Sequence, residues 1–339
     1  MQALVKVKKG FKNVELHNIP EPHPGEGQVK IHVKWAGICG TDIHIYRDEY
    51  PYNPPVVLGH EFSGEVIECG KNVKTCRPRD RVSARTYMIT CGNCVYCNTG
   101  RDNLCLERQS IGSGVNGAFA KYIVVPEKNI FILPDITDYQ EGALSEPIAC
   151  CVHAILERTC ISPGENVLVI GPGPIGLIST QLAKISGAHV VIMGTKKDQE
   201  RLILSKKFGA DEYIFHEQIK ESQRVDGTFI FDVILECSGS EGGINTGISL
   251  VRRGGKYTEL GLVGNTIQFP IDQMIYKEIK FTGSFAHTWS SWKKTMSLLA
   301  DQLVKPKDLI SHKLSIKDWE KGFDLIEKKE GVKVLLRPE

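Results

Sequence analysis

The sequence lacks a long uninterrupted apolar run and carries almost no net charge. Among its 339 residues, 42 lysines and arginines stand against 40 aspartates and glutamates, which leaves a formal net charge of +2. Such a chain has no overall field to attract nucleic acid or anionic lipid, so we expect neither as a partner. The longest apolar stretch, 167–178, is broken by glycines and prolines, and no secretory signal is visible. We therefore expect a cytoplasmic protein without a membrane span.

Length and the placement of turn residues indicate two domains, at about 150 residues per domain. Residues 1–125 alternate short apolar runs with proline and glycine, which favours strands and loops. After Pro163, apolar runs alternate with helix-like segments or loops, which is typical of buried parallel strands covered by helices. These runs are 167–170, 190–193, 230–235 and 257–262, and helices are expected around 292–303 and 317–328.

Eleven cysteines need an explanation, and four of them follow the spacing C-x2-C-x2-C-x7-C. These four are Cys91, Cys94, Cys97 and Cys105. Two-residue gaps let successive thiolates turn toward one centre, and four sulfurs suit a tetrahedral Zn²⁺ ion with no open position. We predict a structural zinc site here, with an iron–sulfur cluster or incidental thiols as the alternatives.

Three further segments carry metal-ligand residue types beside glycines or proline: one around Cys39, one at His60 and Glu61, and one at Glu146. Residues 59–73 match the signature G-H-E-x-x-G-x-x-x-x-x-G-x-x-V at all fixed positions, namely Gly59, His60, Glu61, Gly64, Gly70 and Val73. On these residues the chain resembles the zinc-containing medium-chain alcohol dehydrogenases, and the resemblance spans its whole length.

The resemblance implies a catalytic zinc held by Cys39, His60 and Glu146, with Glu61 a ligand in some members and behind the ligands in others. Glutamate at position 146 is similar to the sorbitol-type polyol dehydrogenases, whereas many simple alcohol dehydrogenases have cysteine there. Zinc can lower the pKa of a bound hydroxyl from far above neutrality toward about 7, which eases hydride release from the carbon.

Catalytic roles are implied for Thr41 and His44 as a proton path and for Glu61 beside the metal. The alternatives are that Thr41 only caps a helix and that His44 is a surface residue. Asp42 is expected to accept a hydrogen bond from a ligand imidazole, and His287 is a candidate hydrogen-bond donor to a polyol.

A dinucleotide site is predicted where the run 167–170 leads into the motif G-x-G-x-x-G. Gly171 permits the turn, Gly173 lets the backbone approach a pyrophosphate, and Gly176 allows close packing of the helix on the strand. Pro174 and Ile175 begin the helix, whose N-terminus favours a phosphate. The turns after the later runs should receive the nicotinamide half through Cys237, Ser238, Leu262 and Val263.

The end of the second run bears on the choice of coenzyme. Gly194, Thr195 and Lys196 stand where an NAD site presents an acid, so we favour NADP and keep NAD as the alternative. Asp198 is the residue that weakens this choice, because it reaches the ribose if the strand ends later.

The expected fold is α/β: a GroES-like β-barrel catalytic domain, 1–148 with 284–339, plus a Rossmann doubly wound parallel sheet, 149–283. We predict an NAD(P)-dependent oxidation of a secondary hydroxyl in a polyol or sugar alcohol, with two zinc ions per subunit. The rivals are a threonine-type dehydrogenase, whose family usually has aspartate at position 146, and a non-catalytic zinc or redox-sensing protein. The resemblance implies a homotetramer or homodimer.

Overall fold

The computed structural model describes residues 1–219 and 230–339, and it divides the chain into two compact units. Unit 1 contains Met1–Ala149 and His287–Glu339, and unit 2 contains Cys150–Ala286. The division falls inside helix α4 (Ser145–Val152), which a π-helical segment, His153–Thr159, continues. Each unit has its own apolar core.

Unit 1 is built mainly of antiparallel strands, as the short apolar runs between turn residues predicted. Its main sheet has the order β10-β6-β5-β3-β18-β17, and β9 also pairs with β3. The long strand β3 connects these elements, because it pairs with β5 along one edge and with β9 and then β18 along the other. This arrangement brings the C-terminal strand β18 beside the segment that leads to Cys39.

The strands of unit 1 are β1 (Gln2–Lys6), β2 (Val14–Asn18), β3 (Gln28–Gly37), β4 (Val56–Val57), β5 (Glu61–Cys69), β6 (Arg81–Ala84), β7 (Tyr87–Ile89), β8 (Gln109–Ser110), β9 (Tyr122–Pro126), β10 (Ile130–Ile132), β17 (Ile310–Ser315) and β18 (Lys333–Arg337). Its other helices are α1 (Gly40–Tyr46), α2 (Val95–Asn98), α3 (Tyr139–Gly142), α10 (Trp289–Ala300) and α11 (Trp319–Glu327). The two C-terminal helices lie where the sequence placed them.

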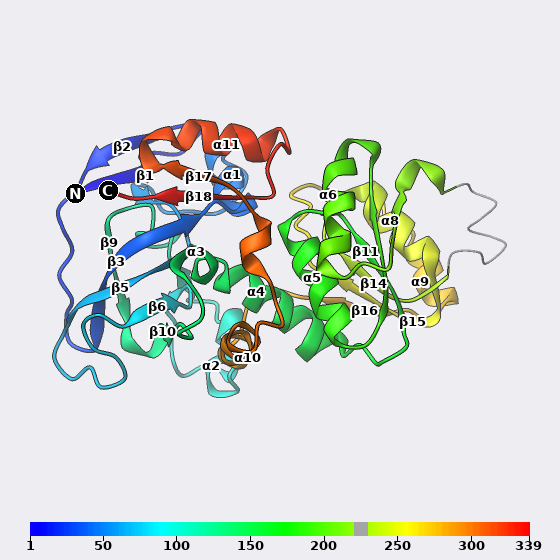
Figure 1. The fold of residues 1–339 in the computed structure, drawn as a ribbon, viewed down its shortest axis with the longest axis horizontal. Coiled ribbons are helices and arrows are strands. Elements are labelled where there is room, and N and C mark those ends of the chain that lie inside the picture. The colour runs from blue at the N-terminus through cyan, green and yellow to red at the C-terminus, as the bar shows by residue number, and fades with distance from the viewer. Residues whose placement is uncertain (220–229) are drawn as a thin grey trace. The chain divides into compact units, whose positions relative to one another are not determined.

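Unit 2 is a six-stranded parallel sheet in the order β13-β12-β11-β14-β15-β16. In sequence this is the order 3-2-1-4-5-6 of a doubly wound sheet, which the sequence predicted. Figure 1 shows α5 and α6 on one face of this sheet and α8 and α9 on the other. Because helices cover both faces, the central residues Val167, Leu168 and Val169 are completely buried.

The strands of unit 2 are β11 (Asn166–Ile170), β12 (His189–Gly194), β13 (Glu212–Phe215), β14 (Phe231–Glu236), β15 (Val251–Glu259) and β16 (Lys280–Gly283), and its helices are α5 (Pro174–Ile185), α6 (Gln199–Ser205), α8 (Glu241–Leu250) and α9 (Ile271–Tyr276). Strand β15 begins earlier and ends earlier than the apolar run 257–262 suggested. Its first half passes through glycines and exposed arginines, which carry no apolar signal.

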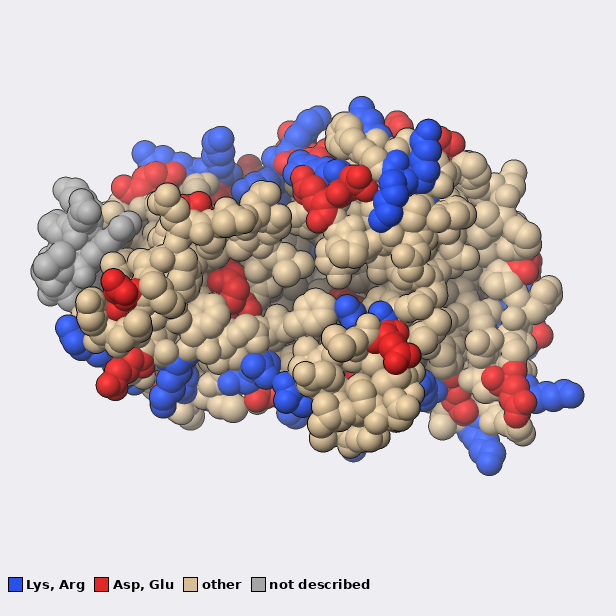
Figure 2. All heavy atoms as spheres, turned by 180° about the vertical axis from the view of Figure 1, so that it is seen from behind, with Lys and Arg blue, Asp and Glu red and all other residues tan. Residues whose placement is uncertain are grey.

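Two features of the structure concern its surface charge and its helices. On the face seen in Figure 2, lysine and arginine side chains lie among aspartates and glutamates. No helix in the described ranges combines the length and hydrophobicity that spanning a bilayer requires.

Candidate metal centres and coenzyme site

The four-cysteine loop of unit 1 folds its thiols toward one point. Ligand atoms of Cys91, Cys94, Cys97 and Cys105 all lie within 4.8 Å of one another. Cys91 Sγ is 3.6 Å from Cys105 Sγ and 3.9 Å from Cys97 Sγ, and none of the four is in a disulfide. A closed set of four thiols at this spacing fits a tetrahedral Zn²⁺ ion.

Backbone amides already stabilise thiolates in this loop. Cys94 N–H and Cys97 N–H donate to the sulfurs of Cys91 and Cys94 at 3.4 and 3.5 Å. Backbone hydrogen bonds from Asn93 and Cys94 lower the pKa of Cys91 to about 7. The loop therefore favours the charged form of the Cys91 sulfur, whereas burial raises the pKa of the Cys97 thiol to about 12.

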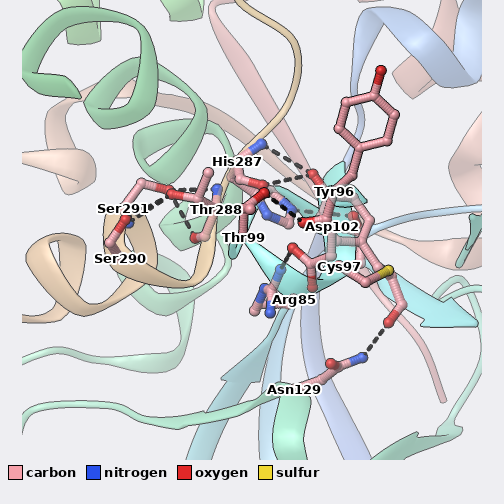
Figure 3. A network of polar contacts seen from close by, with 12 residues as sticks. Arg85, Tyr96, Cys97, Thr99, Asp102, Asn129, His287, Thr288, Ser290 and Ser291 are labelled. Atoms are coloured by element: carbon pink, nitrogen blue, oxygen red, sulfur yellow. Dashed lines mark hydrogen bonds and ion pairs between the residues drawn. The ribbon is translucent and has the colours of Figure 1, made fainter. Parts of the chain in front are cut away.

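The loop is attached to the rest of unit 1 by an ion pair. Arg85 on the segment between β6 and β7 contacts Asp102 at 2.6 Å, as Figure 3 shows. The Arg85 side chain is only 6% exposed, so this contact is sheltered from solvent. The second half of the thiol loop is thereby held on the barrel strands.

A second cluster lies where α1 and β5 begin. Ligand atoms of Cys39, His60 and Glu61 lie within 4.8 Å of one another, and Glu61 is buried. Cys39 is the N-cap of α1, and Asp42 closes the cap by accepting from Cys39 N–H at 2.9 Å. The sulfur, nitrogen and oxygen donors fit a catalytic zinc, which needs a mixed set. The structure thus brings together three of the four residues predicted around this metal.

Asp42 is fully buried and lies behind His60. Its Oδ1 is 3.7 Å from His60 Nδ1, beyond hydrogen-bond length, and it also accepts from Gly59 N–H at 3.3 Å. Burial lowers the pKa of His60, but Cys39 and Asp42 raise it by more, so that it lies well above its ordinary value. The negative groups around this imidazole therefore favour its protonated, positively charged form over the neutral one.

Lys333 of β18 supplies a positive charge to this cluster. Its Nζ donates to both carboxylate oxygens of Glu61, at 2.8 and 2.7 Å, and to the carbonyl of Ile38 at 3.2 Å. Burial lowers the pKa of Lys333, but Glu61, Cys39 and Glu146 raise it by more, so that it lies above its ordinary value. Sequence reasoning missed Lys333. The signal was a lysine inside the apolar run Val332–Leu336.

Glu146 begins α4 and is 7% exposed. It is not one of the three residues whose ligand atoms cluster within 4.8 Å, although its charge acts on Lys333. Its Oε1 lies 3.6 Å from His287 Nε2. A ligand role for Glu146 remains a prediction.

His287 is fully buried. Its ring stacks on Tyr87 with centroids 4.6 Å apart, and Nε2 is 3.1 Å from Thr86 Oγ1. The expected hydrogen bond from His287 to a polyol stays a prediction. Figure 3 shows the histidine at the start of the capped turn of Thr288 and Ser291.

The predicted proton path starts on α1. Thr41 Oγ1 lies 3.7 Å from Cys39 Sγ, beside the metal cluster. His44, one turn further, is paired through Nδ1 with Glu49 Oε2 at 2.9 Å. This contact leaves Nε2 as the nitrogen that can exchange a proton with another group.

In unit 2, the predicted pyrophosphate turn follows β11. Gly171 has φ +94°, and a Cβ there would lie 2.9 Å from Ser238, whereas a Cβ on Gly176 would lie 1.9 Å from the carbonyl oxygen of Gly171. A Cβ on Gly173 would meet nothing within 4 Å, so open space adjoins this glycine at the N-terminus of α5. This space and the free helix N-terminus fit a pyrophosphate. Pro174 and Ile175 form the first turn of α5.

The other predicted coenzyme residues gather at the same edge of the sheet. Gly171 N–H donates to the carbonyl of Met193, the residue before Gly194, and Cys237 N–H donates to Ile170, both at 2.8 Å. A Cβ on Gly239 would lie 2.5 Å from the carbonyl of Leu262, so the turn of Cys237 and Ser238 also contacts that of Leu262 and Val263. The switch between β11 and β14 is where doubly wound sheets bind ligands.

In the turn after β12, Asp198 lies closer to the end of the strand than the sequence suggested. Asp198 Oδ2 accepts from Thr195 N–H at 3.0 Å and from Thr195 Oγ1 at 2.7 Å, and Asp198 is 7% exposed. The Thr195 hydroxyl, which could otherwise donate to a 2′-phosphate, therefore already donates to Asp198. Lys196 and Lys197 remain exposed beside it.

Comparison with known proteins agrees with this geometry. Residues 25–135 match the family model "Alcohol dehydrogenase GroES-like domain", and residues 174–301 match "Zinc-binding dehydrogenase". The chain is 42% identical to a sorbitol dehydrogenase of Halalkalibacterium halodurans (100% of this chain, 99% of the relative) and 35% identical to an L-threonine 3-dehydrogenase of Bacillus velezensis (100% and 99%). A zinc-binding dehydrogenase of Sinorhizobium meliloti, solved with NADP, superposes with TM-score 0.91 at 31% identity over 99% of both chains. The chain therefore belongs to the zinc-containing medium-chain alcohol dehydrogenases and is an oxidoreductase that acts on CH–OH groups.

Proposed function

We propose that this enzyme reversibly oxidises a secondary hydroxyl of a polyol or sugar alcohol and passes the hydride to a nicotinamide coenzyme. The observation that carries the proposal is the cluster of Cys39, His60 and Glu61 on unit 1. Support for the substrate class comes from the full-length similarity to a sorbitol dehydrogenase and from glutamate at position 146. We propose two zinc ions per chain, one for this cluster and one for the four thiols.

Cys39 and His60 would hold the catalytic zinc, together with Glu146 or Glu61. A bound Zn²⁺ ion supplies Lewis acidity that makes a substrate hydroxyl more acidic. Residues of the chain itself would then carry the hydroxyl proton from the substrate to solvent. Thr41 offers a hydroxyl 3.7 Å from Cys39 Sγ, and His44, held by Glu49, offers a nitrogen that exchanges protons with solvent.

We favour NADP over NAD for this enzyme. Gly194 carries no side chain that would exclude a 2′-phosphate, and Lys196 and Lys197 are exposed beside it. The similar Sinorhizobium meliloti protein was solved with NADP. Asp198 argues for NAD instead, because its carboxylate would repel a 2′-phosphate. This carboxylate is, however, buried and accepts a hydrogen bond from the Thr195 hydroxyl.

Oxidation of an amino alcohol is the second candidate. The specific observation in its favour is 35% identity over the whole chain to an L-threonine 3-dehydrogenase. The sorbitol dehydrogenase is more similar, at 42%.

The test is a matrix of sorbitol, xylitol, galactitol and L-threonine, each assayed with NAD and with NADP on zinc-loaded protein. We expect at least one polyol to exceed L-threonine in kcat/KM by about tenfold or more, with NADP preferred. Preference for L-threonine would support the second candidate, and turnover that survives removal of the zinc would contradict both. Light scattering of the same preparation tests the expected homodimer or homotetramer.

A further inference from the structure

Two glutamates face each other at the ends of neighbouring strands in unit 2. Glu236 ends β14, Glu259 ends β15, and the two residues are partners in the register of the parallel pair. Glu236 is completely buried and Glu259 is half-buried. In the part of the chain that the structure describes, neither carboxylate forms an ion pair with lysine or arginine. A buried charge without a cationic partner is costly unless hydrogen bonds compensate it.

Glu236 holds the turn that follows its own strand. Its carboxylate accepts from Ser238 N–H at 3.1 Å, from Gly239 N–H at 2.9 Å and from the Ser238 hydroxyl. Such hydrogen bonds stabilise the charged form of the carboxylate. Ser238 was predicted to contact the coenzyme, so Glu236 fixes a segment of the predicted nicotinamide site from behind.

Glu236 also holds the turn that follows the next strand. Its carbonyl accepts from Leu260 N–H at 2.8 Å and from Gly261 N–H at 3.1 Å. The two turns are in close contact, because a Cβ on Gly261 would lie 2.2 Å from Gly239 N and 2.9 Å from Glu236 Oε2. Movement of Glu236 would therefore displace both turns.

Glu259 completes the pair as its protonated member. Burial and the charge of Glu236 raise the pKa of Glu259 to about 9. The other titratable groups that face it are Tyr257, whose hydroxyl donates to Glu259 Oε2 at 3.2 Å, and Cys237. Burial raises the pKa of both Tyr257 and Cys237, so they stay neutral. At neutral pH Glu259 therefore keeps its proton beside Glu236.

We propose that Glu236 is a positioning residue for the coenzyme: while Glu259 holds its proton, Glu236 fixes the turns 237–239 and 260–263 that receive the nicotinamide end. When hydroxide or a buffer base removes that proton, two adjacent carboxylates repel each other and the turns shift, which weakens coenzyme binding. The proposal rests on the proposed function, since it assumes a nicotinamide coenzyme at this edge of the sheet.

The pair also links stability to pH, without any coenzyme. The ordinary pKa of a glutamate is near 4.5, and Glu259 is raised from it to about 9. Between these values the folded chain keeps a proton that the unfolded chain has released, so stability falls as pH rises through this window and changes no further above it. Glu259→Gln removes this dependence, because an amide cannot ionise.

The experiment compares wild type with Glu259→Gln, Glu236→Gln and the control Glu212→Gln, an exposed glutamate on β13. Melting temperatures of the coenzyme-free proteins are followed from pH 6 to 10, and NADPH and NADH are titrated by fluorescence at each pH. We expect the wild-type Kd to rise about tenfold between neutral and alkaline pH, and the rise to be absent in Glu259→Gln. Glu236→Gln should raise Kd at every pH, and the control should follow wild type.

Each outcome is informative. Equal pH dependence of Kd and melting temperature in wild type and Glu259→Gln would overturn the positioning role while leaving the proposed function intact. Failure of both coenzymes to bind at any pH would overturn the proposed function instead, and the positioning role with it. If Glu236→Gln does not fold, the comparison of wild type with Glu259→Gln still decides the matter.

Discussion

Lys333 and Glu61 form a buried ion pair although they are 272 positions apart in the sequence. Their side chains are 3% and 1% exposed, and Nζ contacts both carboxylate oxygens. The pair exists because β18 returns to β3, which also pairs with β5, the strand that begins at Glu61. It joins the C-terminal strand to the metal cluster.

Lys333→Met should destabilise the protein strongly. Removing one partner leaves the buried Glu61 carboxylate without its cation, which costs about 3–5 kcal/mol in the free energy of unfolding. Urea denaturation of zinc-loaded protein measures this cost. Lys333→Arg is the matched control and should lose less, because it keeps the charge. A loss below about 1 kcal/mol for Lys333→Met would show that solvent or the metal compensates Glu61.

Cys97→Ser should remove one zinc equivalent per chain. A serine hydroxyl replaces a thiolate poorly in a closed four-sulfur site, and we expect the loop between β7 and β8 to need a bound metal to fold. The zinc content, measured by elemental analysis, and the melting temperature should both be lower than in wild type. Cys160→Ser is the control, because Cys160 is an exposed cysteine outside both clusters. Unchanged zinc content in Cys97→Ser would exclude this loop as a metal site.

Two glycines of the dinucleotide turn should respond differently to alanine. At Gly173 the added Cβ meets nothing, so Gly173→Ala should change stability by at most about 1 kcal/mol while it weakens coenzyme binding. At Gly176 the Cβ would lie 1.9 Å from a backbone oxygen, so Gly176→Ala should destabilise the fold itself. Urea denaturation and NADPH titration separate the two effects. Equal losses of stability would contradict this division.

The sequence predicted features that depend on short-range spacing. The four thiols are close in the chain, and the dinucleotide turn follows directly after a strand, so local pattern was sufficient for both. Lys333 and the pair of Glu236 with Glu259 depend on which strands become neighbours, and this is decided by packing of the whole sheet. The hydrogen bonds between Thr195 and Asp198 were also missed, because a one-turn 3₁₀-helix, Lys196–Asp198, folds the acid back onto the strand end.

Thr41→Val tests the proton path next to the metal cluster. Valine has the shape of threonine but no hydroxyl, so the fold, the zinc content and the coenzyme Kd should remain those of wild type. A positioned proton-transfer group contributes about 10²- to 10⁴-fold, and kcat should fall within this range. In wild type the Thr41 hydroxyl lies 3.7 Å from Cys39 Sγ. Thr41→Ser keeps a hydroxyl at this position and should retain most of the activity. Steady-state kinetics with the preferred polyol, together with elemental analysis, checks both variants. A kcat for Thr41→Val close to that of wild type would mean that the proton leaves the substrate by another route.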